Sequence, residues 1–185
     1  MKRLICIFMI FAVVGTLASC SMSGKESHNG EVAVFYSDQE NEYISGIKSE
    51  LDSLFTGSGV KYTSYNAKGS DDSMEKQIED AVKNGAKALI VDVNEDDISE
   101  HACEIAMQKD IPVVFFGTNT ENETDGYKKA AFVEIERLGA STDFEGAAKT
   151  IVKILDNFVK GEDRFKDIDD MYHDGYMTVY VPTLE

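Results

Sequence analysis

The sequence predicts an α/β domain for residues 31–185, a doubly wound parallel sheet with helices on both faces. From Glu31 onward, short β-rich runs alternate with segments of helical period, and this alternation implies right-handed βαβ crossovers. The run Ala88–Val93 is nearly all apolar, which is typical of a strand covered on both faces. In such sheets ligands bind beyond the carboxyl ends of the strands.

The first half of the domain is expected to hold three strands and two helices. The strands are predicted at Val32–Tyr36, Val60–Tyr65 and Ala88–Val93. One apolar stripe is expected on the first helix, before Gly57–Gly59 ends it: Ile44, Ile47, Leu51 and Phe55. Asp72 with Glu75 predicts a capping box at the start of the second helix. The inner face of that helix is expected to be Met74, Ile78, Ala81 and Val82.

The second half is expected to continue the alternation. Strands are predicted at Pro112–Phe116, Ala130–Ile135 and Tyr176–Val181. The third helix has an apolar stripe of Ile98, Ala102, Ile105 and Ala106, after a capping pair at Asp97 and Glu100. Thr142 and Glu145 are expected to cap a longer fourth helix, and its inward residues are Phe144, Ala147, Ile151, Ile154, Leu155 and Phe158.

Residues 1–19 are typical of a secretory signal peptide. Lys2 and Arg3 precede the apolar run Ile5–Val14, which is shorter than the roughly 20 residues that span a bilayer. The following Leu17–Cys20 resembles the lipobox of bacterial lipoproteins. That resemblance implies cleavage before Cys20 and a lipid on its thiol. Residues 20–30 would then be a flexible tether, and the protein would be lipid-anchored in the bacterial cell envelope, facing the periplasm or the exterior.

The charge and the cysteines exclude several classes of protein. The chain holds 34 acidic and 18 basic residues, a net charge of −16, so binding to nucleic acid is not expected. On the resemblance to a lipoprotein signal, Cys6 would leave with the signal peptide and Cys20 would carry lipid. Only Cys103 then remains, so the mature domain can form no internal disulfide. Cys103 lies at a helical position between apolar residues, and we expect it to be packed rather than nucleophilic.

The sequence offers no constellation for catalysis, so the protein is not expected to be an enzyme. It contains no Gly-x-Gly-x-x-Gly after the first strand, no Gly-Lys-Ser/Thr loop and no Gly-x-Ser-x-Gly elbow. His28, His101 and His173 are far apart and have no metal-ligand spacing. We therefore expect neither a catalytic residue nor a cofactor.

Several segments follow one another in an order found in one known family. They are Val32–Ile47, Asn84–Asp92, Ile111–Phe116 followed by Tyr127–Ala130, the turn Gly139–Gly146, and Asp170–Gly175 before a strand. Together they resemble the galactose/glucose-binding proteins of bacterial sugar ABC transporters, in the type I periplasmic binding protein superfamily. The resemblance covers Glu31–Pro182, although Ser141 stands where the family has Asp. It implies the N-terminal lobe of a two-lobed fold, with the second lobe absent from this chain.

The resemblance also implies a sugar site. The positions of the family's hydrogen-bonding and stacking residues in the first loop are Asn41 and Tyr43 here, and Asp92 stands where the family has Asn at the end of the third strand. A pyranose needs an aromatic ring for its apolar face and polar partners for its hydroxyls. Residues alone leave two alternatives: Tyr43 as a core residue at the helix end, and Asp92 as a solvated acid or helix cap. Asp38, Gln39 and Asn119 are weaker candidates at the rim.

The family's calcium loop is altered in this chain. Asp170 and Asp174 keep two of its ligands, but Tyr172 replaces a middle one, so bound calcium and any other metal are not expected. The expected partners are a monosaccharide similar to galactose or glucose and an ABC permease that receives it. The alternative is a non-catalytic interaction or signalling module that presents the lobe to a membrane sensor without tight sugar binding.

Overall fold

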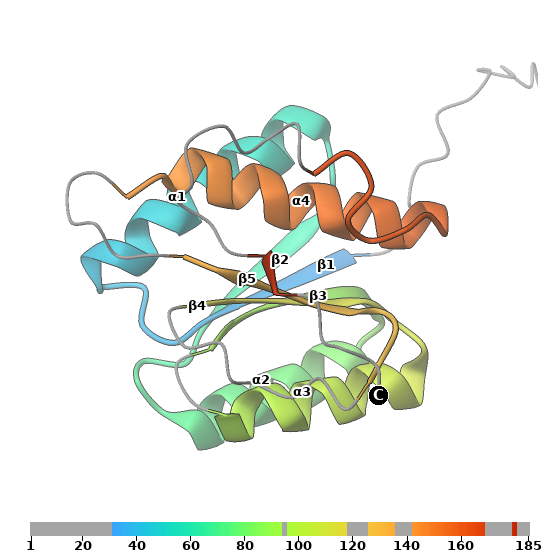
Figure 1. Ribbon diagram of the computed structural model, residues 1–185. Coiled ribbons are helices and arrows are strands. Elements are labelled where there is room, and N and C mark those ends of the chain that lie inside the picture. Colours follow the sequence, from blue (N-terminus) through green and yellow to red (C-terminus); the bar gives the residue numbers. More distant parts are fainter. Residues whose placement is uncertain (1–30, 94–95, 118–125, 136–141, 169–178, 181–185) are drawn as a thin grey trace, which may run out of the picture.

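The computed structural model describes residues 31–93, 96–117, 126–135, 142–168 and 179–180, which form one sheet between two layers of helices (Figure 1). In the spatial order β2-β1-β3-β4-β5-β6, the strands are β2 (Tyr62–Asn66), β1 (Glu31–Tyr36), β3 (Ala86–Val93), β4 (Val113–Gly117), β5 (Ala130–Glu134) and β6 (Val179–Tyr180). The helices are α1 (Glu42–Ser58), α2 (Asp71–Lys83), α3 (Asp96–Lys109) and α4 (Phe144–Lys160).

The strand directions confirm the doubly wound parallel prediction for β1 to β5. The short strand β6 departs from it, because it pairs antiparallel with β5 and places Val179 opposite Val133. An edge strand has only one neighbour to satisfy, and antiparallel edge strands are common on otherwise parallel sheets. The other residues of the predicted strand at 176–181 lie outside the described part of the chain.

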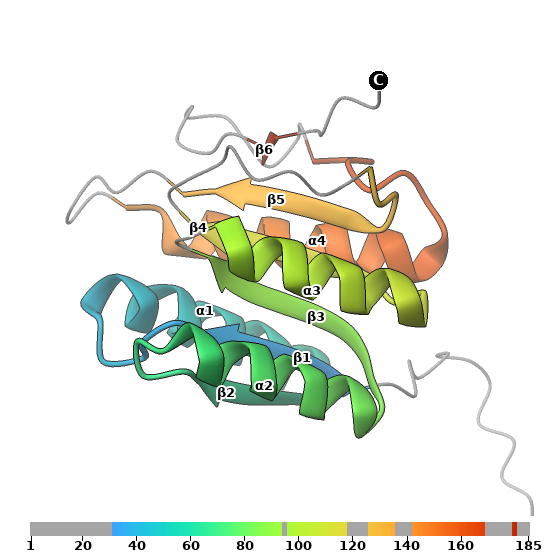
Figure 2. The same cartoon turned by 90° about the horizontal axis from the view of Figure 1, so that it is seen from below.

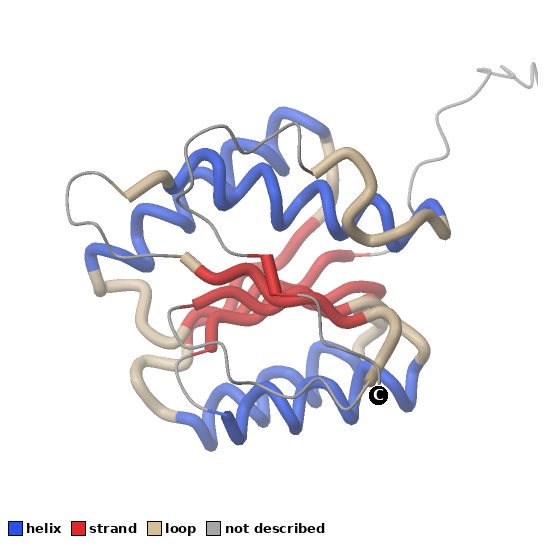
Figure 3. Tube along the Cα trace, in the orientation of Figure 1, coloured by secondary structure: helices blue, strands red, loops and turns tan. Residues whose placement is uncertain are grey.

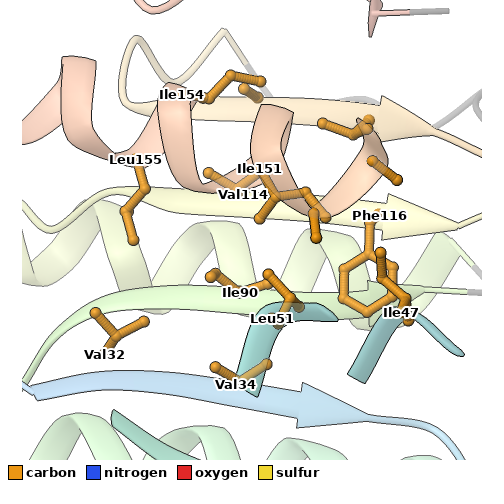
Figure 4. Packing of buried hydrophobic residues seen from close by; sticks show 14 of the residues in the cluster. Val32, Val34, Ile47, Leu51, Ile90, Val114, Phe116, Ile151, Ile154 and Leu155 are labelled. Carbon is orange, nitrogen blue, oxygen red and sulfur yellow. The ribbon is translucent and has the colours of Figure 1, made fainter. Parts of the chain in front are cut away.

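The helices divide between the two faces of the sheet. Helices α1 and α4 pack side by side over one face, and α2 and α3 cover the other (Figures 1 and 3). The view from below shows α2 and α3 in front of the strands (Figure 2). Because side chains alternate along each strand, the sheet contributes to two separate apolar cores. In the core beneath α1 and α4, Val34, Ile90 and Val114 meet Leu51 and Ile151 (Figure 4).

The apolar stripes predicted for α1 and α2 are confirmed, residue for residue. The predicted start of α2 is wrong. Its N-cap is Ser70, whose hydroxyl accepts a hydrogen bond from the Ser73 N–H at 3.3 Å, so Asp72 lies inside the first turn. Ser70 has the extended backbone of an N-cap, and its short side chain places the hydroxyl oxygen within reach of the first helical N–H groups. Asp72 instead stabilises the helix from within the first turn, where its negative charge lies near the positive end of the helix dipole.

The predicted start of α4 is also one residue off. Asp143, and not Thr142, is the N-cap, and its carboxylate accepts a hydrogen bond from the Gly146 N–H at 2.8 Å. Helix α3 begins at Asp96, one residue before the predicted capping residue Asp97. None of the described helices has the length and apolar character needed to cross a membrane.

A buried amide fixes the chain that follows α4. Asn157 is fully buried in the last turns of α4, and its Nδ2 donates to the carbonyl oxygens of Arg164 at 3.1 Å and Lys166 at 2.9 Å. The guanidinium of Arg164 donates in turn to the carbonyl of Ala130, the first residue of β5. Ile168 is buried in the core beneath α1 and α4. The charged turn after α4 is therefore held against the domain.

Candidate functional site

The three predicted sugar-site residues belong to the edge of the sheet where β1 and β3 end. Asn41 is the N-cap of α1, and its Oδ1 accepts a hydrogen bond from the Tyr43 N–H at 3.0 Å. The Asn41 N–H donates to the Asp38 carbonyl at 3.1 Å, which closes the loop between β1 and α1. Asn41 is exposed, so its side-chain oxygen supports the start of the helix at a position accessible to solvent.

Tyr43 lies at the edge of the core and not inside it. Its half-buried ring packs edge-on against Phe144, with ring centroids 5.6 Å apart, and its hydroxyl donates to the Ile135 carbonyl at 3.5 Å. The contact is tight because Gly46 leaves room for Phe144: a Cβ at position 46 would lie 2.6 Å from Phe144 Cε2. Sequence reasoning counted Phe144 only as an inward helix residue, and its pairing with Tyr43 was missed because it depends on how α1 and α4 cross.

Asp92 is buried, with 1% of its surface exposed, so the alternative of a solvated acid is wrong. Its Oδ2 accepts hydrogen bonds from both the backbone N–H (2.9 Å) and the hydroxyl of Ser37, the first residue after β1. By strand alternation Asp92 shares the α1/α4 face of the sheet with Ile90. The carboxylate thus ties the end of β3 to the loop that leads to Asn41. Sequence reasoning missed Ser37, although a hydroxyl directly after a strand was a usable signal.

The rim candidates have local roles. The Gln39 amide donates to the Ser64 hydroxyl at 3.0 Å and the Tyr65 carbonyl at 3.2 Å, so it joins the first loop to β2. Asp38 accepts a hydrogen bond from the Glu40 N–H at 3.0 Å. Asn119 lies outside the described residues. The same is true of Cys20 and of the altered calcium loop with Asp170, Tyr172 and Asp174, so those predictions stay predictions.

Two further features bear on the chemistry of the domain. Cys103 is buried in the core beneath α2 and α3, as expected for a packed residue. Among the described residues, no group of three or more His, Cys, Asp or Glu side chains is placed to hold a metal ion.

A buried tyrosine hydroxyl lies close to this edge. Tyr36, the last residue of β1, is fully buried and packs edge-on against Phe116 with centroids 6.2 Å apart. Its hydroxyl finds no hydrogen-bond partner among the described residues. Burial raises the pKa of Tyr36 far above its usual value, and the nearby Asp52, Tyr62 and Asp92 raise it further. Burying this hydroxyl therefore lowers the stability of the folded protein, because no hydrogen bond compensates for the loss of its contacts with water.

We expect Tyr36→Phe to raise the free energy of unfolding by about 1–2 kcal/mol at pH 7, because it removes an unpartnered buried hydroxyl. It should also weaken alkaline destabilisation. The stability linked to a raised tyrosine pKa is fully present below about pH 10 and is lost as pH rises, since the unfolded chain releases the proton first. Urea unfolding at pH 7 and at about pH 11 measures both effects. Tyr65→Phe, at a half-buried ring, is the control. Equal behaviour of the two variants would contradict the assignment.

The strand order, with polar side chains collected where β1 and β3 end, defines a doubly wound domain of the kind that binds ligands beyond its strand ends. A family model described as "Periplasmic binding protein domain" matches residues 32–175. The chain belongs to this family. No curated protein matches it in sequence.

A solved structure shares the fold at low sequence identity, and a second one matches a smaller part of the chain. The myo-inositol binding protein of Caulobacter, bound to myo-inositol, matches with a TM-score of 0.51 and 17% identity over 76% of this chain and 43% of that chain. An ABC transporter solute-binding protein from Clostridium phytofermentans with bound β-D-glucose matches with a TM-score of 0.44 and 21% identity, over 46% of this chain and 26% of that one. The chain thus spans less than half the length of either structure.

Proposed function

We propose that the chain is the ligand-binding lobe of a sugar-binding lipoprotein, which captures a monosaccharide similar to galactose or glucose for an ABC permease and catalyses no reaction. The observation that supports this most directly is the family match over residues 32–175. The neighbours named above were solved with myo-inositol and with glucose, two polyhydroxylated rings of similar size. The permease, the sugar and the lipid on Cys20 are parts of the same proposal.

In this proposal the sugar lies over the start of α1. Tyr43 provides an aromatic ring, and the exposed amide of Asn41 provides a donor for a hydroxyl. Asp92 is too buried to contact a sugar directly in the arrangement described. Its role in this proposal is to hold Ser37 and the loop between β1 and α1 in place. Phe144 closes one side of Tyr43, and this contact must open for a pyranose to stack on that side of the ring.

A single lobe is expected to bind weakly. Periplasmic binding proteins enclose a ligand by closing two lobes around it, and this chain spans 43% or less of the two structures described. Each lost hydrogen bond costs about 1 kcal/mol, so half of the contacts should give a dissociation constant of about 1 mM or weaker. A suitable measurement must therefore detect millimolar affinity.

Backbone amide shifts in an NMR titration with glucose, galactose and myo-inositol test the proposal. We expect one of these sugars to shift the amides of residues 37–43 and of Asp92. Tyr43→Ala should weaken binding about tenfold, the worth of one stacking contact. The matched control is Tyr62→Ala, at a half-buried tyrosine whose ring lies 5.0 Å from that of Phe55, near the opposite end of the sheet. No shift with any sugar would overturn the proposal and leave an interaction module.

A further inference from the structure

An apolar groove opens between α1 and α4 at the end of the sheet opposite to the predicted sugar site. Its volume is about 660 Å³. The floor is formed by Val32 and Ala88, at the amino ends of β1 and β3, and the walls by Leu54 of α1 and by Val152 and Val159 of α4. Figure 4 shows Val32 and Leu155 at this end of the core, away from Phe116 and Ile47.

The groove is a surface feature and not a packing defect inside the core. Val159 is 43% exposed, one of only two large apolar side chains that are exposed among the described residues. Exposed apolar grooves on monomeric domains generally mark a contact with another apolar surface. The walls come from two helices that are in close contact elsewhere along their length, so the opening belongs to the fold.

Lysines stand at the margin of this groove, although the chain as a whole is strongly acidic, with a net charge of −16. Lys87, Lys149 and Lys153 all line it, and Asp156 is the one acidic residue among the lining side chains. Lys87 forms no ion pair with any described residue. Lys149 forms an exposed pair with Glu145 at 2.6 Å, and the half-buried Lys153 lies 3.8 Å from the exposed Asp167; such pairs at the surface open at low cost. This end therefore combines apolar walls with ammonium groups.

The tether enters the domain beside the groove. Glu31 begins β1, and Val32 lies in the groove floor. The 11-residue segment 20–30 joins Cys20 to this point, and such a segment extends at most roughly 36–40 Å. A lipid on Cys20 would hold the groove within this distance of the bilayer. Tethering raises the effective concentration of the groove at the bilayer surface, so a weak contact between them suffices to orient the domain.

We propose that the groove docks onto the lipid bilayer, with the apolar walls at the acyl boundary and the lysines at the phosphates of anionic lipids. The proposal rests on the lipid anchor at Cys20 that forms part of the proposed function. Amphipathic surfaces bind bilayers in this way, through buried apolar area together with attraction to anionic headgroups. Docked by this end, the domain presents the edge that contains Asn41 to the side away from the membrane.

The absence of tryptophan from the sequence gives a direct test. The lipidated protein carrying Val159→Trp is reconstituted into vesicles of phosphatidylcholine and phosphatidylglycerol whose acyl chains are brominated. We expect bromine to quench the new indole at least threefold more than in the control Met107→Trp. Met107 is similarly exposed, at 47%, but lies on α3 across the sheet. Equal quenching in the two variants would overturn the proposal. Thermal melts confirm that both variants fold.

A charge variant tests the role of the lysines. The triple substitution Lys87→Glu, Lys149→Glu and Lys153→Glu, combined with Val159→Trp, should lose most of the quenching on vesicles with phosphatidylglycerol. Unchanged quenching would overturn the headgroup contact. The mass of the N-terminal peptide shows whether Cys20 carries lipid, and an unmodified peptide would overturn the inference. These variants should leave the sugar titration unchanged, because the groove and the proposed sugar site are at opposite ends of the sheet. Failure of docking is thus distinguishable from failure of sugar binding.

Discussion

Gly117→Ala is expected to lower the free energy of unfolding by about 3 kcal/mol or more. Gly117 ends β4 opposite Val93 of β3, and a Cβ at this position would lie 2.1 Å from the Val93 carbonyl oxygen and 3.2 Å from its carbonyl carbon. These are backbone atoms in the middle of the sheet, so no side-chain rotation relieves the overlap. The two strands would have to separate where their carboxyl ends meet. Urea unfolding followed by circular dichroism measures the loss.

The chain offers a matched control for this substitution. Gly57 lies in the last turn of α1, where a Cβ would have no atom within 4 Å, and it does not need a left-handed backbone. Gly57→Ala should therefore be neutral or stabilise the protein by up to about 1 kcal/mol, because alanine is the better helix former. A similar change in stability for both variants would show that the close approach of β3 and β4 is not the cause.

Asp92→Ala is expected to cost about 3 kcal/mol of stability and to abolish the sugar response. The substitution removes the acceptor of two Ser37 donors, and each donor left unsatisfied inside the protein costs about 1–3 kcal/mol. Without the carboxylate, the first loop loses this link to the end of β3, and the surroundings of Asn41 lose their order. Urea unfolding and the NMR titration measure the two effects on the same sample.

Two further variants test the hydrogen bonds between Asp92 and Ser37 separately. Asp92→Asn keeps an acceptor oxygen and should lose less stability than Asp92→Ala. Ser37→Ala removes the hydroxyl but keeps the N–H, and a double-mutant cycle with Asp92→Ala isolates the energy of the side-chain pair. A coupling energy near zero would show that Asp92 acts independently of Ser37 and would contradict the link between β3 and the first loop.

Much of the fold follows from local patterns in the sequence. The stripe Ile44, Ile47, Leu51 and Phe55 recurs at helical spacing, and the apolar run Ala88–Val93 marks a central strand; both lie where expected. Helix starts were less accurate. Ser70 and Asp143 each compete with a nearby polar residue that fits a cap equally well in the sequence, and only the backbone entering the helix decides between them.

The surroundings of the site residues depend on contacts distant in sequence. Asp92 and Ser37 are 55 positions apart, and only the parallel pairing of β1 with β3 brings them together. The contact of Tyr43 with Phe144 requires α1 and α4 to meet at Gly46. No local pattern contains this information. The sequence could therefore indicate which edge of the sheet matters, but not that the carboxyl group of Asp92 at the end of β3 is buried and already hydrogen-bonded.

The buried amide of Asn157 has a consequence for proteolysis. Trypsin cuts after basic residues, and three of them lie at the end of α4 and just beyond it: Lys160, Arg164 and Lys166. A protease must draw several residues of extended chain into its cleft, yet the carbonyls of Arg164 and Lys166 are bound to Asn157, and Ile168 is anchored in the core. Cleavage after Arg164 or Lys166 requires this segment to detach first, so the segment is a poor trypsin substrate while the domain stays folded.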